Sequence, residues 1–348
     1  MFQRRGVAVE LHDIEIWSQA AEGCSLDDRI DEINSCYDLV MIGPAGFLGP
    51  RMIDSLFSVP SSWQRLTTPL CFNGVGIVAS VTRPVWYGAM DMETPVMRAL
   101  SQASVVSTRE LNSWLLGSRA LGGDTGRLML AGCPSMRLAH CSPLVRRTHD
   151  LALNLSFHHE VCRRYIPVLL QIAKTVQAQK RRVLWVCHSR LDEIQATGVN
   201  RELRLGFDVL RPRTAAQAGA AYAACDCALV TRFHAGVFCL ANAVPFGFIG
   251  YDVKCWHLMS MFADEPYQYV LPIDRLTCED ADSQIGLLFR RLEDNAQQLR
   301  TAQRLLVAHF AAQTDRFVDA VIAAVRAHRP GYDASSFLLQ NAPDEMPG

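Results

Sequence analysis

Short apolar runs alternate with helical patterns along most of the chain. In the first half, the runs of strand length lie at 38–43, 70–74, 104–107 and 128–131. Apolar residues recur at three- and four-residue spacing at 94–102 and 109–116, which predicts helices. Alternation of apolar strands with amphipathic helices is typical of α/β units built on a parallel sheet.

A second series of the same kind follows a polar segment at 138–150, which we interpret as a linker. Its predicted strands lie at 151–156, 183–188, 227–231 and 245–250, and its predicted helices at 160–179, 215–224, 233–243 and 254–262. The stretch 279–328 is mostly helical in pattern. The sequence therefore predicts two α/β domains, 1–145 and 146–330 with C-terminal helices, and a tail at 331–348. A cleft between two such domains is a common place for a ligand.

Composition narrows the class of protein. The 348 residues include 34 Lys and Arg against 35 Asp and Glu, a formal net charge of −1, so we expect no nucleic-acid partner. The twelve cysteines form no C-x-x-C pair, and neither cysteine nor carboxylate stands at ligand spacing from the histidines, so we expect no metal. No apolar run approaches the ~20 residues of a membrane-spanning helix, and the first residues show no signal peptide. We therefore expect a soluble, cytoplasmic protein.

The most informative stretch is DCALVTRFHAGVFCLANAVPFGFIGYDVK, residues 226–254. An apolar strand there runs directly into Arg232 and His234. A helix then starts with the small residues Ala235 and Gly236. Backbone N–H groups and the positive end of the dipole favour an anion at a helix N-terminus. A guanidinium suits phosphate or carboxylate, and an imidazole transfers protons near neutral pH. The alternative is that both side chains only satisfy polar groups at a strand–helix corner.

A second strand end follows the same helix. The run PFGFIG leads to Tyr251, Asp252 and Lys254. Because the carboxyl ends of parallel strands meet at one edge of a sheet, we expect two cations, an imidazole and a phenol to converge there. The strand VLWVC delivers His188 and Arg190 to the same edge.

These residues carry a family resemblance. TRFHAG…ANAVPFGFIGYDVK resembles the signature S-R-x-H…G-x-P…Y-x-x-K of the polysaccharide pyruvyl transferases. Upstream, Ser107, Arg109, Glu110 and Ser113 are similar to the family's S-x-R-E-x-x-S. FNGVGI at 72–77 resembles its glycine-containing strand end, and DLVMIGPAGFL at 38–48 resembles its glycine-rich segment. Order and spacing agree over most of the chain.

The resemblance implies a fold similar to the two-domain GT-B glycosyltransferases. It also implies transfer of a pyruvyl group from phosphoenolpyruvate to a sugar diol of a polysaccharide or its lipid-linked precursor, with no metal or cofactor. The expected catalytic residues are His234 as acid/base with Arg232 and Arg109 as an anion clamp. The expected donor-binding residues are Lys254, Tyr251, His188, Arg190, Ala235 and Gly236. The N-terminal domain would hold the acceptor, with Gly43, Gly46, Asn73, Gly74 and His158 on that side. A lipid-linked acceptor would bring the protein to a membrane surface without a spanning segment.

Two of these residues have structural alternatives. Ser107 and Glu110 have the spacing of a capping box, which would place Arg109 in the first helical turn without a structural role. His158 and His159 could be surface or capping residues at a helix start.

Departures from the family pattern keep other functions open. Cys133 stands where the family has Asp, and Pro44 interrupts the triple glycine and removes a backbone N–H. One alternative is a GT-B glycosyltransferase with a nucleotide-sugar donor, in which Asp252 would bind the ribose. The other is a non-catalytic, carbohydrate-binding relative.

Overall fold

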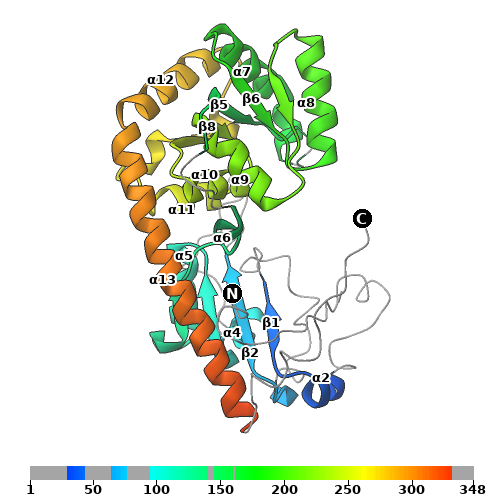
Figure 1. Ribbon diagram of the computed structural model, residues 1–348, viewed down its shortest axis with the longest axis vertical. Coiled ribbons are helices and arrows are strands. Elements are labelled where there is room, and N and C mark those ends of the chain that lie inside the picture. The colour runs from blue at the N-terminus through cyan, green and yellow to red at the C-terminus, as the bar shows by residue number, and fades with distance from the viewer. Residues whose placement is uncertain are drawn as a thin grey trace.

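The computed structural model describes residues 30–43, 64–76, 95–139, 145–157, 159 and 161–330. They form two α/β units, each on its own parallel sheet. A long helix runs alongside both units (Figure 1).

The first unit has a four-stranded sheet in the order β1-β2-β3-β4. Its strands are β1 (Val40–Ile42), β2 (Leu70–Val75), β3 (Val105–Thr108) and β4 (Leu128–Leu130). Its helices are α2 (Ile30–Cys36), α4 (Pro95–Gln102), α5 (Leu111–Ala120), η4 (Thr125–Arg127) and α6 (Ser135–Ala139). β3 is buried along its whole length, which is typical of a central parallel strand. Phe72, Val106, Leu100 and Leu116 pack together beside the sheet.

The second unit has a six-stranded sheet in the order β10-β9-β8-β5-β6-β7. Its strands are β5 (His149–Asn154), β6 (Val183–Val186), β7 (Asp208–Leu210), β8 (Cys225–Val230), β9 (Phe246–Gly250) and β10 (Val270–Pro272). Its helices are η5 (Cys162–Tyr165), α7 (Ile166–Ala178), α8 (Arg190–Glu202), α9 (Ala215–Ala223), α10 (Phe233–Ala241), α11 (Lys254–Met259), η6 (Pro266–Gln268), η7 (Ile273–Arg275) and α12 (Ala281–Asp294). Central β5, β6, β8 and β9 are largely buried, and most of their buried residues are apolar. This unit holds a continuous hydrophobic core.

Helix α13 (Ala296–His328) ties the two units together. In its first half, Leu299 and Phe310 belong to the core of the second unit. Further along, Phe317, Val318 and Val321 pack with residues of the first sheet. The sequence assigned this helical segment to the second domain, whereas its last turns lie on the first sheet.

All eight predicted strands are present, each shifted by at most a few residues. The strands β7 and β10 were not predicted. Both are three residues long at the sheet margins, and β7 is largely exposed, so neither has a strong apolar run. Helix α8 was also missed, because its sequence RLDEIQATGVNRE is mostly polar. The predicted linker runs into β5, which begins at His149.

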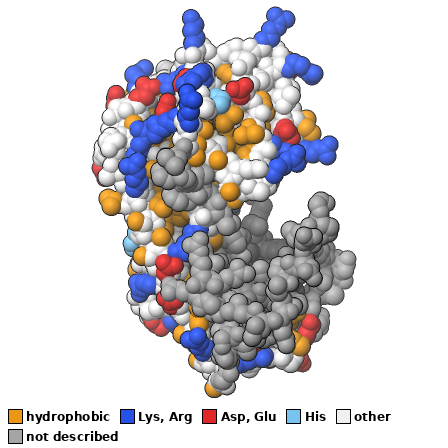
Figure 2. All heavy atoms as spheres, viewed as in Figure 1, with side chains coloured by type: hydrophobic (Ala, Val, Ile, Leu, Met, Phe, Trp, Pro, Cys, Tyr) orange, Lys and Arg blue, Asp and Glu red, His pale blue; other side chains and the backbone are white. Residues whose placement is uncertain are grey.

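The surface carries charges of both signs. Figure 2 shows Lys and Arg side chains projecting from the second unit, with Asp, Glu and hydrophobic side chains between them. The exposed hydrophobic residues of this unit include Leu191 and Ile194 on α8. Within the described ranges, no helix is both long and apolar enough to cross a membrane. The same residues hold no cluster of three His, Cys, Asp or Glu that could bind a metal ion.

Candidate active site

Two neighbouring strand ends form the centre of the candidate site. β8 and β9 pair in parallel, with Val230 opposite Phe248. β8 leads into Arg232 at the start of α10, and β9 leads through Tyr251 to α11. The structure therefore brings the two predicted strand ends together, as expected from the sequence.

The start of α10 is fixed by hydrogen bonds of its backbone to Asn154 and within the first turn. Arg232 is the extended N-cap residue, and its N–H donates to Asn154 Oδ1 at 3.1 Å. The Arg232 carbonyl accepts the N–H groups of Ala235 at 3.1 Å and Gly236 at 3.4 Å. A Cβ on Gly236 would lie 2.4 Å from the Phe248 ring, so close packing of α10 on β9 requires glycine here. Packing against β9 thus accounts for Gly236, and Ala235 is buried in the first turn of the same helix.

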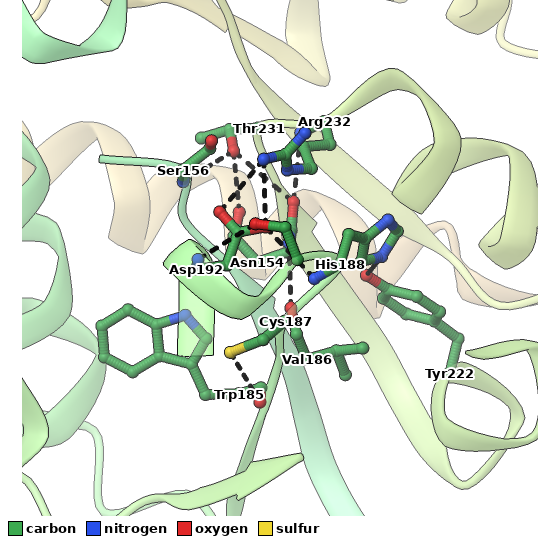
Figure 3. A network of polar contacts seen from close by, with 11 residues as sticks. Asn154, Ser156, Trp185, Val186, Cys187, His188, Asp192, Tyr222, Thr231 and Arg232 are labelled. Atoms are coloured by element: carbon green, nitrogen blue, oxygen red, sulfur yellow. Dashed lines mark hydrogen bonds and ion pairs between the residues drawn. The ribbon is translucent and has the colours of Figure 1, made fainter. Parts of the chain in front are cut away.

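Arg232 is held by a carboxylate that the sequence did not predict. Its Nη2 lies 3.0 Å from Asp192 Oδ2 and donates to Oδ1 at 3.1 Å (Figure 3). Asp192 is 2% exposed, in the first turn of α8. Its N–H donates to the N-cap Ser189 hydroxyl, and its Oδ2 accepts the His188 N–H. The spacing S-x-x-D of Ser189 and Asp192 is typical of a helix start and could have indicated this residue. It was not used because helix α8 itself was not predicted.

Lys254 is held in a similar way. Its Nζ lies 3.2 Å from Asp252 Oδ2 and 5.4 Å from the centre of the Tyr251 ring. Asp252 is 4% exposed and also accepts the Lys254 N–H. The centroid of the His159 ring lies 4.2 Å from that of the Tyr251 ring. Burial raises the pKa of Tyr251, so its hydroxyl stays protonated.

Arg109 reaches this group from the first unit. Its guanidinium lies 4.5 Å from the centre of the Phe233 ring on α10. Its Nε–H donates to Glu110 Oε2 at 2.9 Å, and both side chains are buried. A Cβ on Gly76 would lie 1.9 Å from Arg109 Nε, so the arginine can pass only because residue 76 is glycine. Residues far apart in the sequence thus meet across the two units.

The capping-box prediction for this segment is wrong. Ser107 belongs to β3, where its hydroxyl donates to Asn73 Oδ1 at 3.3 Å and accepts the Gly74 N–H at 2.8 Å. Helix α5 starts later than predicted, and Glu110 is its N-cap. The Glu110 carboxylate accepts the Ser113 hydroxyl as well as Arg109. Arg109 therefore has a structural partner, contrary to the expectation that it had none.

His234 lies on the first turn of α10, and its side chain reaches solvent. Its ring centroid is 5.6 Å from that of Phe233. The pKa of His234 is lowered from 6.5 to about 4. Desolvation of the ring is the largest cause, and three positive charges contribute less. The charges belong to Arg109, Lys254 and Arg232. The imidazole is therefore neutral at pH 7 and able to accept a proton.

His188 and Arg190 follow β6. His188 Nε2 lies 2.8 Å from the hydroxyl of Tyr222, and its ring packs 5.5 Å from that of Phe238. Burial and the charge of Arg232 lower the pKa of His188 from 6.5 to about 4. Arg190 is the first, exposed residue of α8.

Three of the predicted acceptor-side residues, Gly43, Asn73 and Gly74, stand at the carboxyl ends of β1 and β2. Gly43 (φ +123°) and Gly74 (φ +62°) have left-handed backbones that favour glycine. A Cβ on Gly43 would lie 2.1 Å from the Asn73 carbonyl oxygen, so the two strand ends are in contact. The predictions for Gly46 and His158 lie outside the described residues.

Cys133 lies close to this junction. It is 4% exposed, and burial raises the pKa of its thiol, which is therefore neutral. Arg109 and Glu110 both act on it electrostatically. The position at which an aspartate was expected thus holds an uncharged side chain beside a buried ion pair.

Two cavities of about 330 and 370 Å³ lie elsewhere. The first is lined by residues of the amino end of the first sheet and α13, including Thr68, Ser104 and His328. The second lies beside α13, around Phe262 and Leu305. Neither contains a predicted site residue.

Comparison with known families decides the assignment. A family profile described as polysaccharide pyruvyl transferase matches residues 3–253. The chain belongs to the polysaccharide pyruvyl transferase family. This membership confirms the resemblance seen in the sequence and indicates a transferase with a saccharide acceptor. A search of curated proteins found no match.

Solved structures resemble the chain at low identity. A UDP-GlcNAc 2-epimerase from Methanocaldococcus jannaschii, in complex with UDP-GlcNAc and UDP, aligns with TM-score 0.52 and 10% identity over 88% of this chain and 87% of that chain. A protein from Listeria monocytogenes described as a UDP-N-acetylglucosamine 2-epimerase aligns with TM-score 0.55 and 11% identity over 94% of this chain and 82% of that chain. An accessory secretory protein chain from Streptococcus pneumoniae aligns with 87% of this chain, at TM-score 0.46 and 10% identity. The alignment spans only 57% of the length of that protein chain. The first two likenesses establish a GT-B-like fold for this pyruvyl transferase family member.

Proposed function

We propose that this protein transfers the pyruvyl group of phosphoenolpyruvate to a sugar diol and forms a cyclic ketal. The observation that carries the proposal is that Arg232 and Lys254 follow two paired strand ends, that Arg109 lies over the Phe233 ring next to His234, and that all three act electrostatically on His234. Phosphoenolpyruvate carries a phosphate and a carboxylate, so its site needs several fixed cations beside a group that moves protons.

Each proposed cation is oriented by its own carboxylate. Glu110, Asp192 and Asp252 are all less than 5% exposed, and each contacts one of the three cations. Buried, hydrogen-bonded partners limit the movement of a long basic side chain before the substrate arrives. Such preorganisation strengthens electrostatic stabilisation, because little reorganisation accompanies the reaction. Tyr251 and His188 border the cations and would complete the donor site, with Arg190 at its exposed edge.

The chemistry needs two proton movements. In the first step a sugar hydroxyl bonds to C2 of phosphoenolpyruvate, while C3 gains a proton and becomes a methyl group. In the second step the neighbouring hydroxyl replaces phosphate at C2, and its proton leaves with the phosphate. The products are the ketal and inorganic phosphate, so neither a metal nor a redox cofactor is required.

We assign both movements to His234. As a neutral base it would take the proton of the attacking hydroxyl and, once protonated, deliver it to C3 or to the departing phosphate. Bound phosphoenolpyruvate would place negative charge beside the imidazole and raise its pKa from about 4 toward neutrality. A group whose pKa approaches the working pH can both take a proton from the hydroxyl and deliver it to C3 or to the phosphate.

The acceptor would lie against the first unit, near Gly43, Asn73 and Gly74. A polysaccharide precursor, free or lipid-linked, and a cytoplasmic location suit a donor that is a small metabolite. The nucleotide-sugar alternative finds less support, because Asp252 is buried and engaged by Lys254 rather than open to a ribose.

The test is acceptor-dependent phosphate release. The protein is incubated with phosphoenolpyruvate and a panel of free and lipid-linked saccharides with neighbouring hydroxyls. One phosphate should appear per ketal formed, and His234→Gln should lose about 10²–10⁴-fold in rate without a change in unfolding midpoint. Phosphate release that needs no acceptor, or that survives His234→Gln at the full rate, would contradict the proposal.

A further inference from the structure

Tyr222 is a buried polar residue beside the proposed donor site. It lies on α9, next to the second sheet, and its side chain is 0% exposed. Its hydroxyl lies 2.8 Å from Nε2 of His188, and in the described part of the chain this is its hydrogen-bond partner. Figure 3 shows the His188 ring with one nitrogen toward Tyr222 and the other turned away.

This contact determines which nitrogen of His188 carries the proton. Burial raises the pKa of Tyr222, so the phenol remains protonated and has an O–H to donate. A buried donor without an acceptor costs about 1–3 kcal/mol, and the acceptor within reach is Nε2 of His188. A neutral imidazole that accepts at Nε2 must carry its proton on Nδ1.

The surroundings hold the His188 ring in that orientation. The ring lies 5.9 Å from the Tyr222 ring and 5.5 Å from the Phe238 ring, between centroids. Its backbone N–H donates to Asp192, the carboxylate that also binds Arg232. The ring is therefore fixed from two sides and by its main chain.

We propose that Tyr222 is a positioning residue that fixes His188 as the Nδ1–H tautomer and thereby makes it a hydrogen-bond donor to the anionic substrate. This inference rests on the proposed function for its substrate, phosphoenolpyruvate. The Asp192 carboxylate accepts the His188 backbone N–H and also binds Arg232, so His188 stands next to one of the proposed anion-binding cations, whose charge also acts on its ring. A neutral donor binds an anion without a further positive charge that would depress the basicity of His234.

The variant Tyr222→Phe removes only the hydroxyl and keeps the buried ring. ¹⁵N NMR of the histidine rings reports the tautomer directly, in the ligand-free protein at pH 7. His188 should be Nδ1–H in the wild type and should shift toward Nε2–H in Tyr222→Phe. Tyr267→Phe, at a side chain 65% exposed, is the matched control and should leave the His188 signals unchanged.

Calorimetry with phosphoenolpyruvate tests the consequence. Tyr222→Phe should bind it about tenfold more weakly, the lower end of the effect expected for a hydrogen bond to a charged group. The inference is overturned if wild-type His188 is Nε2–H, if Tyr222→Phe leaves the tautomer unchanged, or if the tautomer shifts while the affinity does not. If the wild type binds no phosphoenolpyruvate, the proposed function and the role of His188 toward that substrate both fail, whereas the tautomer assignment is still decided by the spectrum.

Discussion

At the scale of single residues, each of the three cations of the candidate site is paired with a carboxylate. The sequence predicted Arg109, Arg232 and Lys254 but not the pairing of Arg232 with Asp192. Forty positions separate those two residues, and only the tertiary fold brings the first turn of α8 to the residue that follows β8. A local motif shows which residue types stand at a strand end, whereas the partner from a distant element depends on the tertiary fold.

The low pKa of His234 gives a prediction for pH dependence. Because desolvation and then three nearby cations disfavour protonation, kcat/KM should fall only as the pH approaches about 4, the pKa of the His234 imidazole in the substrate-free protein. Lys254→Met removes one cation, so the His234 pKa should rise and the acidic limb should move to higher pH. NMR titration of the imidazole measures the same shift directly.

The control for this experiment is Lys174→Met, an exposed lysine on α7. It should leave the pKa of His234 unchanged. A wild-type pKa near 6.5, or equal shifts in the two variants, would show that the cations do not surround the imidazole as described.

At the scale of elements, buried strands were the most predictable feature. β6 and β9 are buried along their whole length and lack charged residues, and β5 and β8 are buried in their last four residues, which are mostly apolar. Burial on both faces leaves little choice of residue there. Helix α8 was missed because a polar surface helix has a weak periodic pattern. The predicted capping box is wrong because Ser107 lies inside β3 and its hydroxyl donates to Asn73. The local motif had assigned this residue to the start of a helix.

Glycines on two helices give a prediction at this scale. Gly236→Ala should destabilise the protein by about 1–3 kcal/mol, because its Cβ would overlap Phe248 on β9. Gly198→Ala on α8 should instead stabilise it by about 0.5–1 kcal/mol, since nothing lies within 4 Å of that Cβ. Urea unfolding of both variants checks the pair, and equal effects would mean that α10 does not pack against β9 as closely as described.

At the scale of the whole molecule, α13 links the two sheets. Its apolar residues pack on the second unit near its start and on the first sheet near its end. The alternation of strands and helices predicted two units, but it could not show that one helix spans both, because amphipathic spacing is the same whatever sheet it faces. The link also bears on the site, where Arg109 of the first unit meets Phe233 of the second.

Phe317 tests this link. It is 2% exposed and packs with Val105 and Met129 of the first sheet. Phe317→Ala should cost about 3–5 kcal/mol in the free energy of unfolding. Leu305→Ala on the same helix, at a side chain 69% exposed, should cost little. Similar losses from both variants, measured by urea unfolding, would contradict the packing of α13 on the first sheet.

The most direct measurement of the central claim is calorimetry of the whole chain with phosphoenolpyruvate and, separately, with UDP-sugars. If Arg109, Arg232 and Lys254 hold a small dianionic donor beside His234, phosphoenolpyruvate binds and raises the His234 pKa above about 4, whereas UDP-sugars give no heat. Binding of a UDP-sugar together with no detectable binding of phosphoenolpyruvate would contradict the account.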